Sequence, residues 1–464
     1  MSTTLFWFRN DLRLADNPAL TIASETAGAM QPVFLWCPLD EEKWAPGAAS
    51  RWWLHHSLAS LTASLREKSS TLLLRQGITY RDEIQKLFRE TKATRIVWCD
   101  RIEPAWRRID NEVATLCNEL KVEVIRVAPN LLCNYQTHLT KTGKPYQVYT
   151  PFWNAFHAQF ASSMLAQAAL PRTLPMPVED VFSLPLDALE LLPTVDWASG
   201  FPAVWRPGEQ GAQENLARFL ANAIFCYDDE RDYPAIAGTS RLSPHLHFGE
   251  LSIHRIWREC ETLLNDLPLE TATSLPPHKV ASSAPRGNIV QYQKELVWRE
   301  FAHYLLWHFP HTSDAPLREK YARFPWRSAP EDLRQWQRGC TGYPLVDAGM
   351  RELWATGWMH NRVRMITASF LVKDLLVDWR TGAEWFWDTL VDADLANNTL
   401  GWQWTAGCGA DAAPFFRIFN PTTQAEKFDP TGAYRNQWQP RESFAPMIDH
   451  KWARERALAA LQSA

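Results

Sequence analysis

Residues 3–14 read Thr3-Thr-Leu-Phe-Trp-Phe-Arg-Asn-Asp-Leu-Arg-Leu14, an apolar run that gives way abruptly to charged residues. The first third of the chain contains five short apolar runs, at Leu5–Phe8, Pro32–Cys37, Thr71–Leu74, Arg95–Cys99 and Val122–Val127. Because these runs are continuous rather than alternating, they are typical of strands covered on both faces. Amphipathic stretches such as Ser50–Glu67 and Arg81–Glu90 separate them. The alternation predicts an α/β domain over residues 1–130, with a doubly wound parallel sheet of about five strands.

The predicted sheet carries no phosphate-binding fingerprint, because neither GxGxxG nor GxxxxGK[ST] occurs in the sequence. Ligands of such sheets nevertheless bind beyond the carboxyl ends of the strands. This rule places candidate contacts at Arg9, Trp36–Pro38 and Asp100–Glu103. A structural role, in which these residues only cap the ends of the strands, explains their positions equally well.

The remaining two thirds of the chain differ in character. Seven prolines are concentrated in one stretch: Pro171, Pro175, Pro177, Pro185, Pro193, Pro202 and Pro207. They predict a long irregular linker, to which we assign residues 131–205. Helical periodicities then follow at 214–226, 246–264, 288–309, 344–357, 361–377 and 383–391. They predict an all-α C-terminal domain over residues 206–464.

Composition excludes several classes of protein. The 464 residues are 46% hydrophobic and 22% charged, which is typical of a folded soluble chain. The net charge is −4, so any nucleic-acid contact must be a local basic patch. The eight cysteines lack paired spacing, which argues against a zinc ribbon or a disulfide framework. No apolar run approaches the roughly 18 residues that cross a bilayer, and the N-terminus is charged too early for a signal peptide, so we expect a cytoplasmic protein.

The first two of four polar clusters suggest an anion site and a site for a heterocyclic ligand. In Gly238-Thr-Ser-Arg-Leu-Ser-Pro244, Ser243 is predicted to cap a helix that begins at Pro244, and the hydroxyls with Arg241 suit a phosphate. Such caps are also common without a ligand. In the second cluster, Glu295, Trp298 and Arg299 share a helix face, with Tyr292 one turn earlier. They suit a stacked heterocycle, although a Glu–Arg pair beside a buried Trp explains them as well.

The third cluster, Gly357–Met365, closes an Arg-rich stretch. From Arg318 to Arg364 the chain has eight Arg and one Lys against five acids, with Trp residues interleaved. This composition suits a surface that holds phosphates and stacks bases, and a solvated basic face remains the alternative.

The fourth cluster, Asp392-Ala-Asp-Leu-Ala-Asn-Asn398 followed by Gly401-Trp-Gln-Trp404, is costly to bury without partners. No His or Cys joins it at ligand spacing, so we predict polar recognition of a ribose and a nitrogen-rich ring, and no metal.

In this order the clusters resemble the DNA photolyase/cryptochrome family, and within it most closely a bacterial cyclobutane pyrimidine dimer (CPD) photolyase. Four further segments extend the resemblance over essentially the whole chain: Phe6–Arg13, Tyr149–Trp153, Thr341–Asp347 and Phe419–Thr422.

The resemblance implies that the helical domain binds FAD and the α/β domain binds an antenna, either methenyltetrahydrofolate or a deazaflavin. The implied FAD contacts are Tyr227, Thr239, Ser240, Arg241, Leu242, Ser243, Tyr292, Arg299, Asp392, Ala393, Asp394 and Asn398. The implied contacts to DNA and its lesion are Arg231, Glu295, Trp298, Asn361, Arg362, Arg364, Met365, Trp404 and Gln424. Plant cryptochromes typically carry Asp at the position of Asn398, and (6-4) photolyases carry His in place of Asn361 and Met365. Both differences favour a CPD photolyase.

The implied activity is light-driven repair of UV-damaged DNA, by electron transfer from photoexcited, reduced FAD to a flipped-out dimer. Glu295 would stabilise the dimer radical anion, and Trp402, Trp379 and Trp326 match the electron-relay positions of the family. We expect a monomer with no membrane contact and no obligate protein partner. Two alternatives remain, a cryptochrome-type blue-light photoreceptor, which usually carries a C-terminal tail that we do not expect here, and a light-independent DNA-binding protein.

Overall fold

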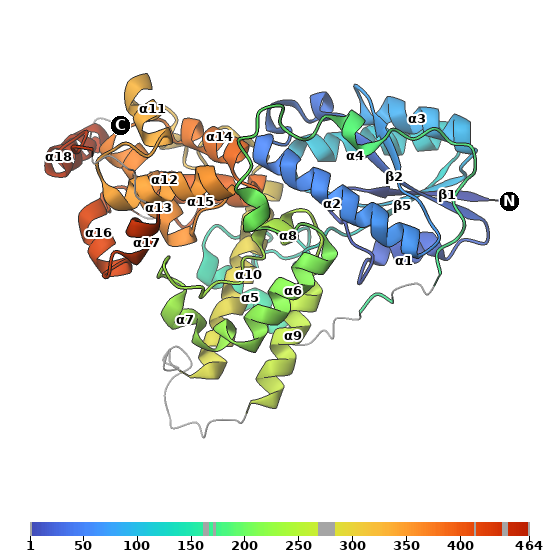
Figure 1. The fold of residues 1–464 in the computed structure, drawn as a ribbon, viewed down its shortest axis with the longest axis horizontal. Helices are drawn as coiled ribbons and strands as arrows, with labels where there is room; N and C mark the ends of the chain where they lie inside the picture. Colours follow the sequence, from blue (N-terminus) through green and yellow to red (C-terminus); the bar gives the residue numbers. More distant parts are fainter. Residues whose placement is uncertain are drawn as a thin grey trace.

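The computed structural model describes residues 2–160, 167–169, 173–267, 284–412, 414–438 and 444–462. An α/β unit and a larger helical unit lie side by side, and a long segment runs back between them (Figure 1).

The α/β unit is built on a five-stranded parallel sheet of order β3-β2-β1-β4-β5. The strands are β1 (Thr3–Phe8), β2 (Ala29–Trp36), β3 (Leu73–Gln76), β4 (Arg95–Cys99) and β5 (Glu123–Val127). Each predicted apolar run forms one strand, so the predicted sheet is confirmed. The central strand β1 is buried along its whole length, because its residues feed the cores on both faces of the sheet.

Helices cover both faces of this sheet. They are α1 (Pro18–Ser24), α2 (Ala48–Glu67), α3 (Tyr80–Thr91) and α4 (Pro104–Leu120). The α1 and α2 side packs on Phe6 and Phe8, whereas the α3 and α4 side packs on Leu5 and Trp7. The doubly wound architecture is therefore confirmed.

A buried ion pair closes the carboxyl end of β1. The guanidinium Nη1 of Arg9 lies 2.5 Å from Oδ1 of Asp110 on α4, and Nη2 donates to the carbonyl of Cys99. The guanidinium also lies 4.8 Å and 5.1 Å from the ring centres of Trp7 and Trp106. Arg9 is therefore fixed as a structural contact between the sheet and α4.

The segment that we expected to be irregular contains a helix, so that part of the prediction is wrong. Helix α5 (Tyr149–Phe160) inserts Phe152 and Phe156 into the core of the helical unit. Its i, i+4 aromatic spacing could have revealed it. Two short 3-10 turns, η2 (Leu186–Leu189) and η3 (Phe201–Ala203), complete the segment, and Pro171 lies outside the described residues.

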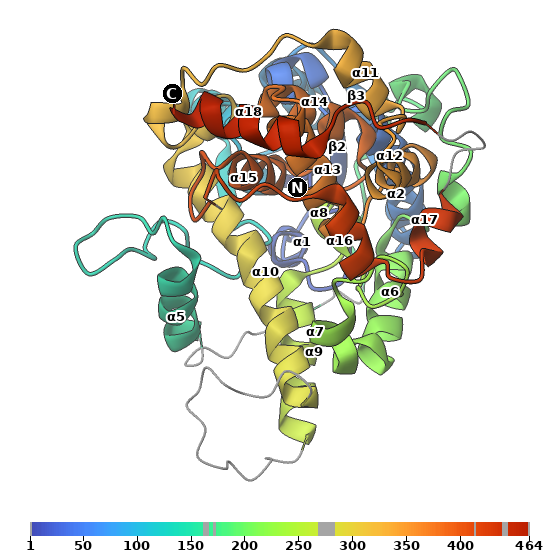
Figure 2. The same cartoon turned by 90° about the vertical axis from the view of Figure 1, so that its left-hand side faces the viewer.

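From residue 206 onward the described residues contain no strand. The helices there are α6 (Glu209–Ala221), α7 (Tyr227–Glu230), α8 (Ser243–His247), α9 (Ile253–Asp266), α10 (Pro285–His308), α11 (Pro330–Gln337), α12 (Pro344–Thr356), α13 (Asn361–Ser369), α14 (Trp379–Thr389), α15 (Leu395–Ala406), α16 (Pro421–Phe428), α17 (Ala433–Gln437) and α18 (His450–Gln462). Short turns η4 (Ala223–Cys226), η5 (Pro310–Ser313) and η6 (Glu319–Tyr321) connect some of them. The 24-residue α10 runs through the unit, and α18 lies at the end opposite α9 (Figure 2).

Two predicted helices are interrupted. The 246–264 periodicity is broken because Gly249 has φ +65° and Ser252 caps a new helix, α9, by accepting from the N–H of Arg255. The 361–377 periodicity changes from α13 to a π-helical turn, η7 (Phe370–Asp374).

We expect Asp110→Ala to lower the free energy of unfolding by about 3–5 kcal/mol, because it leaves the Arg9 guanidinium buried without its carboxylate. Urea unfolding followed by tryptophan fluorescence measures the change. Glu112→Ala is the matched control, since Glu112 lies on the same helix and forms only a solvent-exposed pair with Arg108. The control is expected to change stability by less than about 1 kcal/mol, and an equal loss in both variants contradicts the assignment.

Candidate functional site

An ion pair joins the third and fourth polar clusters. Nη2 of Arg364 on α13 lies 2.8 Å from Oδ2 of Asp392, and Nε of Arg364 donates to the carbonyl of Met359. The other oxygen of Asp392, Oδ1, is buried and has no hydrogen-bond partner within the described part of the chain. An unpaired carboxylate oxygen is costly in the interior. This atom therefore marks a place where the N–H or O–H group of a ligand can donate.

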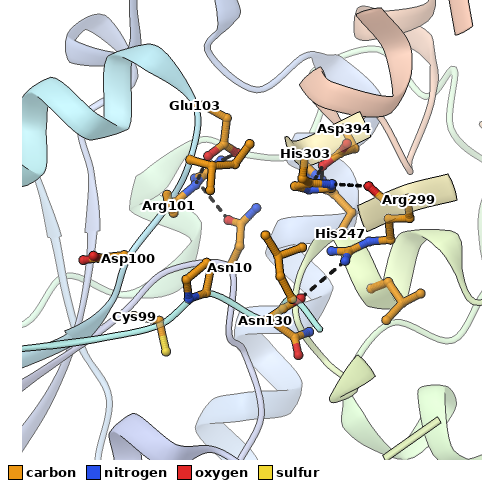
Figure 3. A pocket seen from close by; sticks show the side chains of 14 residues that line it. Asn10, Cys99, Asp100, Arg101, Glu103, Asn130, His247, Arg299, His303 and Asp394 are labelled. Atoms are coloured by element: carbon orange, nitrogen blue, oxygen red, sulfur yellow. Dashed lines mark hydrogen bonds and ion pairs between the residues drawn. The ribbon is translucent and has the colours of Figure 1, made fainter. Parts of the chain in front are cut away.

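Asp394 caps α15 and faces two histidines. Its Oδ1 accepts from the backbone N–H of Asn397 at 2.8 Å and from the side-chain amide of Asn397 at 2.6 Å. Its Oδ2 lies 3.2 Å from Nε2 of His303 and 3.7 Å from Nδ1 of His247 (Figure 3). Burial alone would raise the pKa of Asp394, but the two histidines hold it well below its usual range.

The sequence motifs did not include either histidine. His303 lies one turn beyond Arg299 on α10, and His247 ends α8, so each follows a predicted contact by four residues. That spacing is the only sequence signal that points to them.

In the predicted phosphate-binding segment, Gly238–Pro244, Arg241 is as expected available for an anion. Arg241 adopts a left-handed backbone conformation with φ 52°, and its guanidinium lies 4.6 Å from the ring centre of Trp358. Among the described residues no carboxylate pairs with it, and burial lowers its pKa. Such a cation has an unused capacity for an anion.

The predicted cap at Ser243 is wrong. Helix α8 begins at Ser243 itself, and the residue before it, Leu242, makes no side-chain cap. The hydroxyl of Ser243 instead accepts from Nε1 of Trp358 at 3.4 Å. With only five residues, α8 contributes little as a dipole, so an anion here depends on the hydroxyls and on Arg241.

The start of α13 is fixed by a buried polar network. Nδ1 of His360 accepts from the N–H of Arg362 at 3.2 Å, and Glu352 accepts from the N–H of His360 and from the hydroxyl of Tyr434 at 2.6 Å. Burial lowers the pKa of His360 to about 3, so its imidazole stays neutral and can accept. The network holds Asn361 at the exposed tip of the helix.

Glu295 and Trp298 on α10 interact with residues other than Arg299. Glu295 pairs with Arg231 and accepts from the amide of Gln291, and Trp298 stacks on Tyr149 with ring centres 3.7 Å apart and planes 6° apart. The alternative explanation, a Glu–Arg pair beside a Trp, therefore holds for Glu295, but its partner is Arg231 and not Arg299. Arg299 instead donates to the carbonyl of Asn130.

The Arg-rich stretch is less basic in the fold than in the sequence. Four of its arginines pair with carboxylates, namely Arg327, Arg334, Arg362 and Arg364. Arg351 is turned inward to the carbonyl of Gly339. The remaining predicted lesion contacts, Met365, Trp404 and Gln424, are all half-buried.

Comparison with known proteins identifies the family. A family model described as DNA photolyase matches residues 4–176, and one described as the FAD binding domain of DNA photolyase matches residues 292–460. The deoxyribodipyrimidine photo-lyase of Agrobacterium fabrum is 41% identical over 98% of this chain and 97% of its own. The chain belongs to the DNA photolyase/cryptochrome family.

Other members of this family are also similar over nearly the full chain. Cryptochrome-2 of Arabidopsis thaliana is 35% identical and matches 97% of this chain and 72% of its own. The crystal structure of a class III photolyase from Agrobacterium tumefaciens superposes with a TM-score of 0.90 at 40% identity, covering 100% of this chain and 98% of the other.

The residues present fit the FAD of this family. The unpaired Oδ1 of Asp392 and the unpaired cation of Arg241 offer an acceptor and an anion contact. The side-chain amide of Asn398 donates to the carbonyl of Ala383 at 2.9 Å, which fixes its orientation. Within the described residues no group of three His, Cys, Asp or Glu side chains is placed to hold a metal, and no helix is long and apolar enough to span a membrane.

The three predicted relay tryptophans contact one hydrophobic core. Trp379 and Trp402 are buried in it, and Trp326 is half-buried against it. The ring of Trp402 packs directly on Gly382, one turn from Trp379, where a Cβ atom would approach Cη2 to 2.1 Å.

Pockets also lie beyond the carboxyl ends of the strands, where the sequence placed ligand contacts. Asp100–Glu103 lines one of them and Arg9 and Trp36 line its neighbour. In the second pocket, Glu41 accepts from the hydroxyl of Tyr80 at 2.6 Å. Burial raises the pKa of Glu41 to about 7.

We expect Arg364→Met to weaken FAD binding at least about tenfold, because Asp392 then remains buried without a cation. Fluorescence of FAD released on dilution measures the affinity. Arg362→Met is the matched control, since Arg362 pairs with the more exposed Asp232 and does not contact Asp392. Equal FAD retention in both variants would argue against a cofactor role for the Arg364–Asp392 pair.

Proposed function

We propose that this protein repairs UV-induced cyclobutane pyrimidine dimers in DNA, using light absorbed by bound FAD. The observation that carries the proposal is the unpaired, buried Oδ1 of Asp392, whose other oxygen, Oδ2, accepts from Arg364 on the helix that begins at the exposed Asn361. The ion pair between Arg364 and Asp392 therefore joins the turn that carries a ligand acceptor to the helix that carries a candidate DNA contact. Bound and reduced, FAD supplies the photoexcited electron donor.

The side chains of the protein bind FAD and orient it together with the dimer. Thr239, Ser240 and Arg241, with Leu242 and Ser243, hold the phosphates of FAD, beside Tyr227 and Tyr292. Asp392 and Asp394, with Ala393, accept from its ribose and ring, and Asn398 and Arg299 complete the pocket. A dimer that leaves the base stack enters beside Trp298 and Trp404, because its weakened pairing makes extrusion less costly.

Glu295 orients the dimer. In the structure its carboxylate is held by Arg231 and Gln291, so it is directed rather than free to rotate. We propose that Glu295 donates or accepts a hydrogen bond at the dimer while Arg231 and Arg362 hold the DNA backbone. Asn361, Met365 and Gln424 line the lesion pocket, and the absence of His at 361 and 365 favours a cyclobutane dimer over a (6-4) product.

We further propose that the pockets at the carboxyl edge of the sheet hold the antenna, either methenyltetrahydrofolate or a deazaflavin. Trp44, Trp106 and Trp387 line this region, and flat apolar rings there suit a planar pigment. The absorption spectrum of pigment released by denaturation distinguishes the two.

The test of the proposed function is a count of cyclobutane dimers in UV-irradiated DNA after incubation in blue light and in the dark. We expect loss of dimers in light only, and at least tenfold slower loss for Glu295→Gln at equal FAD content. Light-dependent FAD chemistry without dimer loss would favour a photoreceptor. A colourless protein that binds DNA would favour a light-independent function, and unchanged quantum yield in Glu295→Gln would refute the role of that residue.

We propose that Trp402, Trp379 and Trp326 pass electrons from the surface to oxidised FAD. Trp379→Phe is expected to abolish photoreduction of bound FAD while leaving FAD content unchanged, because phenylalanine is much harder to oxidise than indole. Absorbance under blue light with an external thiol as the electron donor measures the rate. Trp257→Phe, in a different hydrophobic core, is the control and should keep the rate. Normal photoreduction in Trp379→Phe would refute the relay.

A further inference from the structure

His303 has hydrogen-bond acceptors at both ring nitrogens. Nδ1 lies 2.9 Å from the backbone carbonyl oxygen of Arg299, and Nε2 lies 3.2 Å from Oδ2 of Asp394 (Figure 3). A carbonyl oxygen cannot donate. The carboxylate of Asp394 is ionised, because the two neighbouring histidines hold its pKa well below its usual range, and its other oxygen accepts two N–H groups from Asn397. Both nitrogens of His303 must therefore carry hydrogen, which makes the ring a buried imidazolium.

The electrostatics agree with this geometry. Burial would lower the pKa of His303, but the charge of Asp394 raises it above its usual value. The other charged groups around the pair are Arg299 and Glu300 on α10, which lie 3.5 Å apart, and Arg101 and Glu103, which line the same pocket from the α/β unit. His247 lies 3.7 Å from Asp394. Arg101 and Glu103 form an ion pair with each other at 2.5 Å. Asp394 is therefore the carboxylate that forms an ion pair with His303.

A hydrogen bond alone does not require this charge. Oδ2 of Asp394 could be satisfied by a neutral amide at the same position. A buried imidazolium costs desolvation that a neutral side chain avoids. A charge retained at that cost beside a predicted cofactor contact points to an electrostatic role.

We infer that His303 is a positioning residue that keeps one fixed positive charge beside Asp394 and thereby stabilises the negatively charged, reduced form of the flavin. The inference rests on the proposed function, since it requires FAD next to Asp394. Charges act strongly at such a site because the surrounding dielectric is low.

The test uses the full-length protein with FAD bound and measures the equilibrium of FAD reduction by a spectroscopic redox titration in the dark. We expect His303→Gln to lower the equilibrium constant of two-electron reduction at least tenfold, which is about 30 mV. His303→Arg should restore it, because arginine keeps the charge. His308→Gln is the matched control on the same helix, since the ring of His308 contacts the carbonyl of Tyr135 and packs on Tyr304 rather than on Asp394.

A wild-type protein that binds no FAD would refute the proposed function itself. If FAD binds, an unchanged equilibrium in His303→Gln, or a lowered one that His303→Arg fails to restore, would refute only the role of His303. A second measurement covers the case in which His303→Gln does not fold. The ¹⁵N spectrum of histidine-labelled wild-type protein at pH 7.5 should show both nitrogens of His303 protonated, and a neutral ring overturns the inference.

Discussion

The helical unit depends on the ion pair between Arg364 and Asp392. It joins α13, whose first residue is the exposed Asn361, to the acidic turn that precedes α15, the helix of Asn398, Trp402 and Trp404. Removing one partner of a buried pair is costly, so the two helices cannot shift independently. The proposed lesion contacts and the proposed flavin contacts are thereby kept in one fixed relation, and the second oxygen of Asp392 has no hydrogen-bond partner among the described residues.

The sheet and the helical unit could be predicted because the pattern of apolar residues in the sequence shows which segments are buried. Strands covered on both faces appear as continuous apolar runs, and all five runs became strands. The interruptions could not be predicted in the same way. The break between α8 and α9 depends on the positive φ of Gly249, which lies close to the backbone of Asn10. Helix α5 was not predicted because the proline-rich stretch that follows it indicated an irregular segment, although its aromatic residues have the spacing of a buried helix face.

The acidic residues of the candidate site could be predicted from the sequence, but the residues that pair with them could not. Asp392, Asp394 and Glu295 stand out because such groups are rarely buried without a function or a counter-charge. Asp392 pairs with Arg364, and Asp394 lies beside His303 and His247. Glu295 pairs with Arg231. These partners come from other parts of the chain, and only the fold brings them together. The stacking of Trp298 on Tyr149 is equally invisible in the sequence, because α5 itself was not expected.

Two of the three arginines that the family resemblance assigns to DNA, Arg362 and Arg364, are not equally able to reach it. Arg362 pairs with Asp232, whose side chain is 34% exposed, so a phosphate can replace that carboxylate and leave it in water. Arg364 pairs with Asp392, whose side chain is only 3% exposed, so leaving it would strand a charge in the interior. Exchanging the carboxylate for a phosphate therefore costs little free energy at Arg362 and much more at Arg364. Four of the eight arginines in the stretch already pair with carboxylates. We expect a paired arginine to contact DNA only where it can exchange a solvated carboxylate for a phosphate.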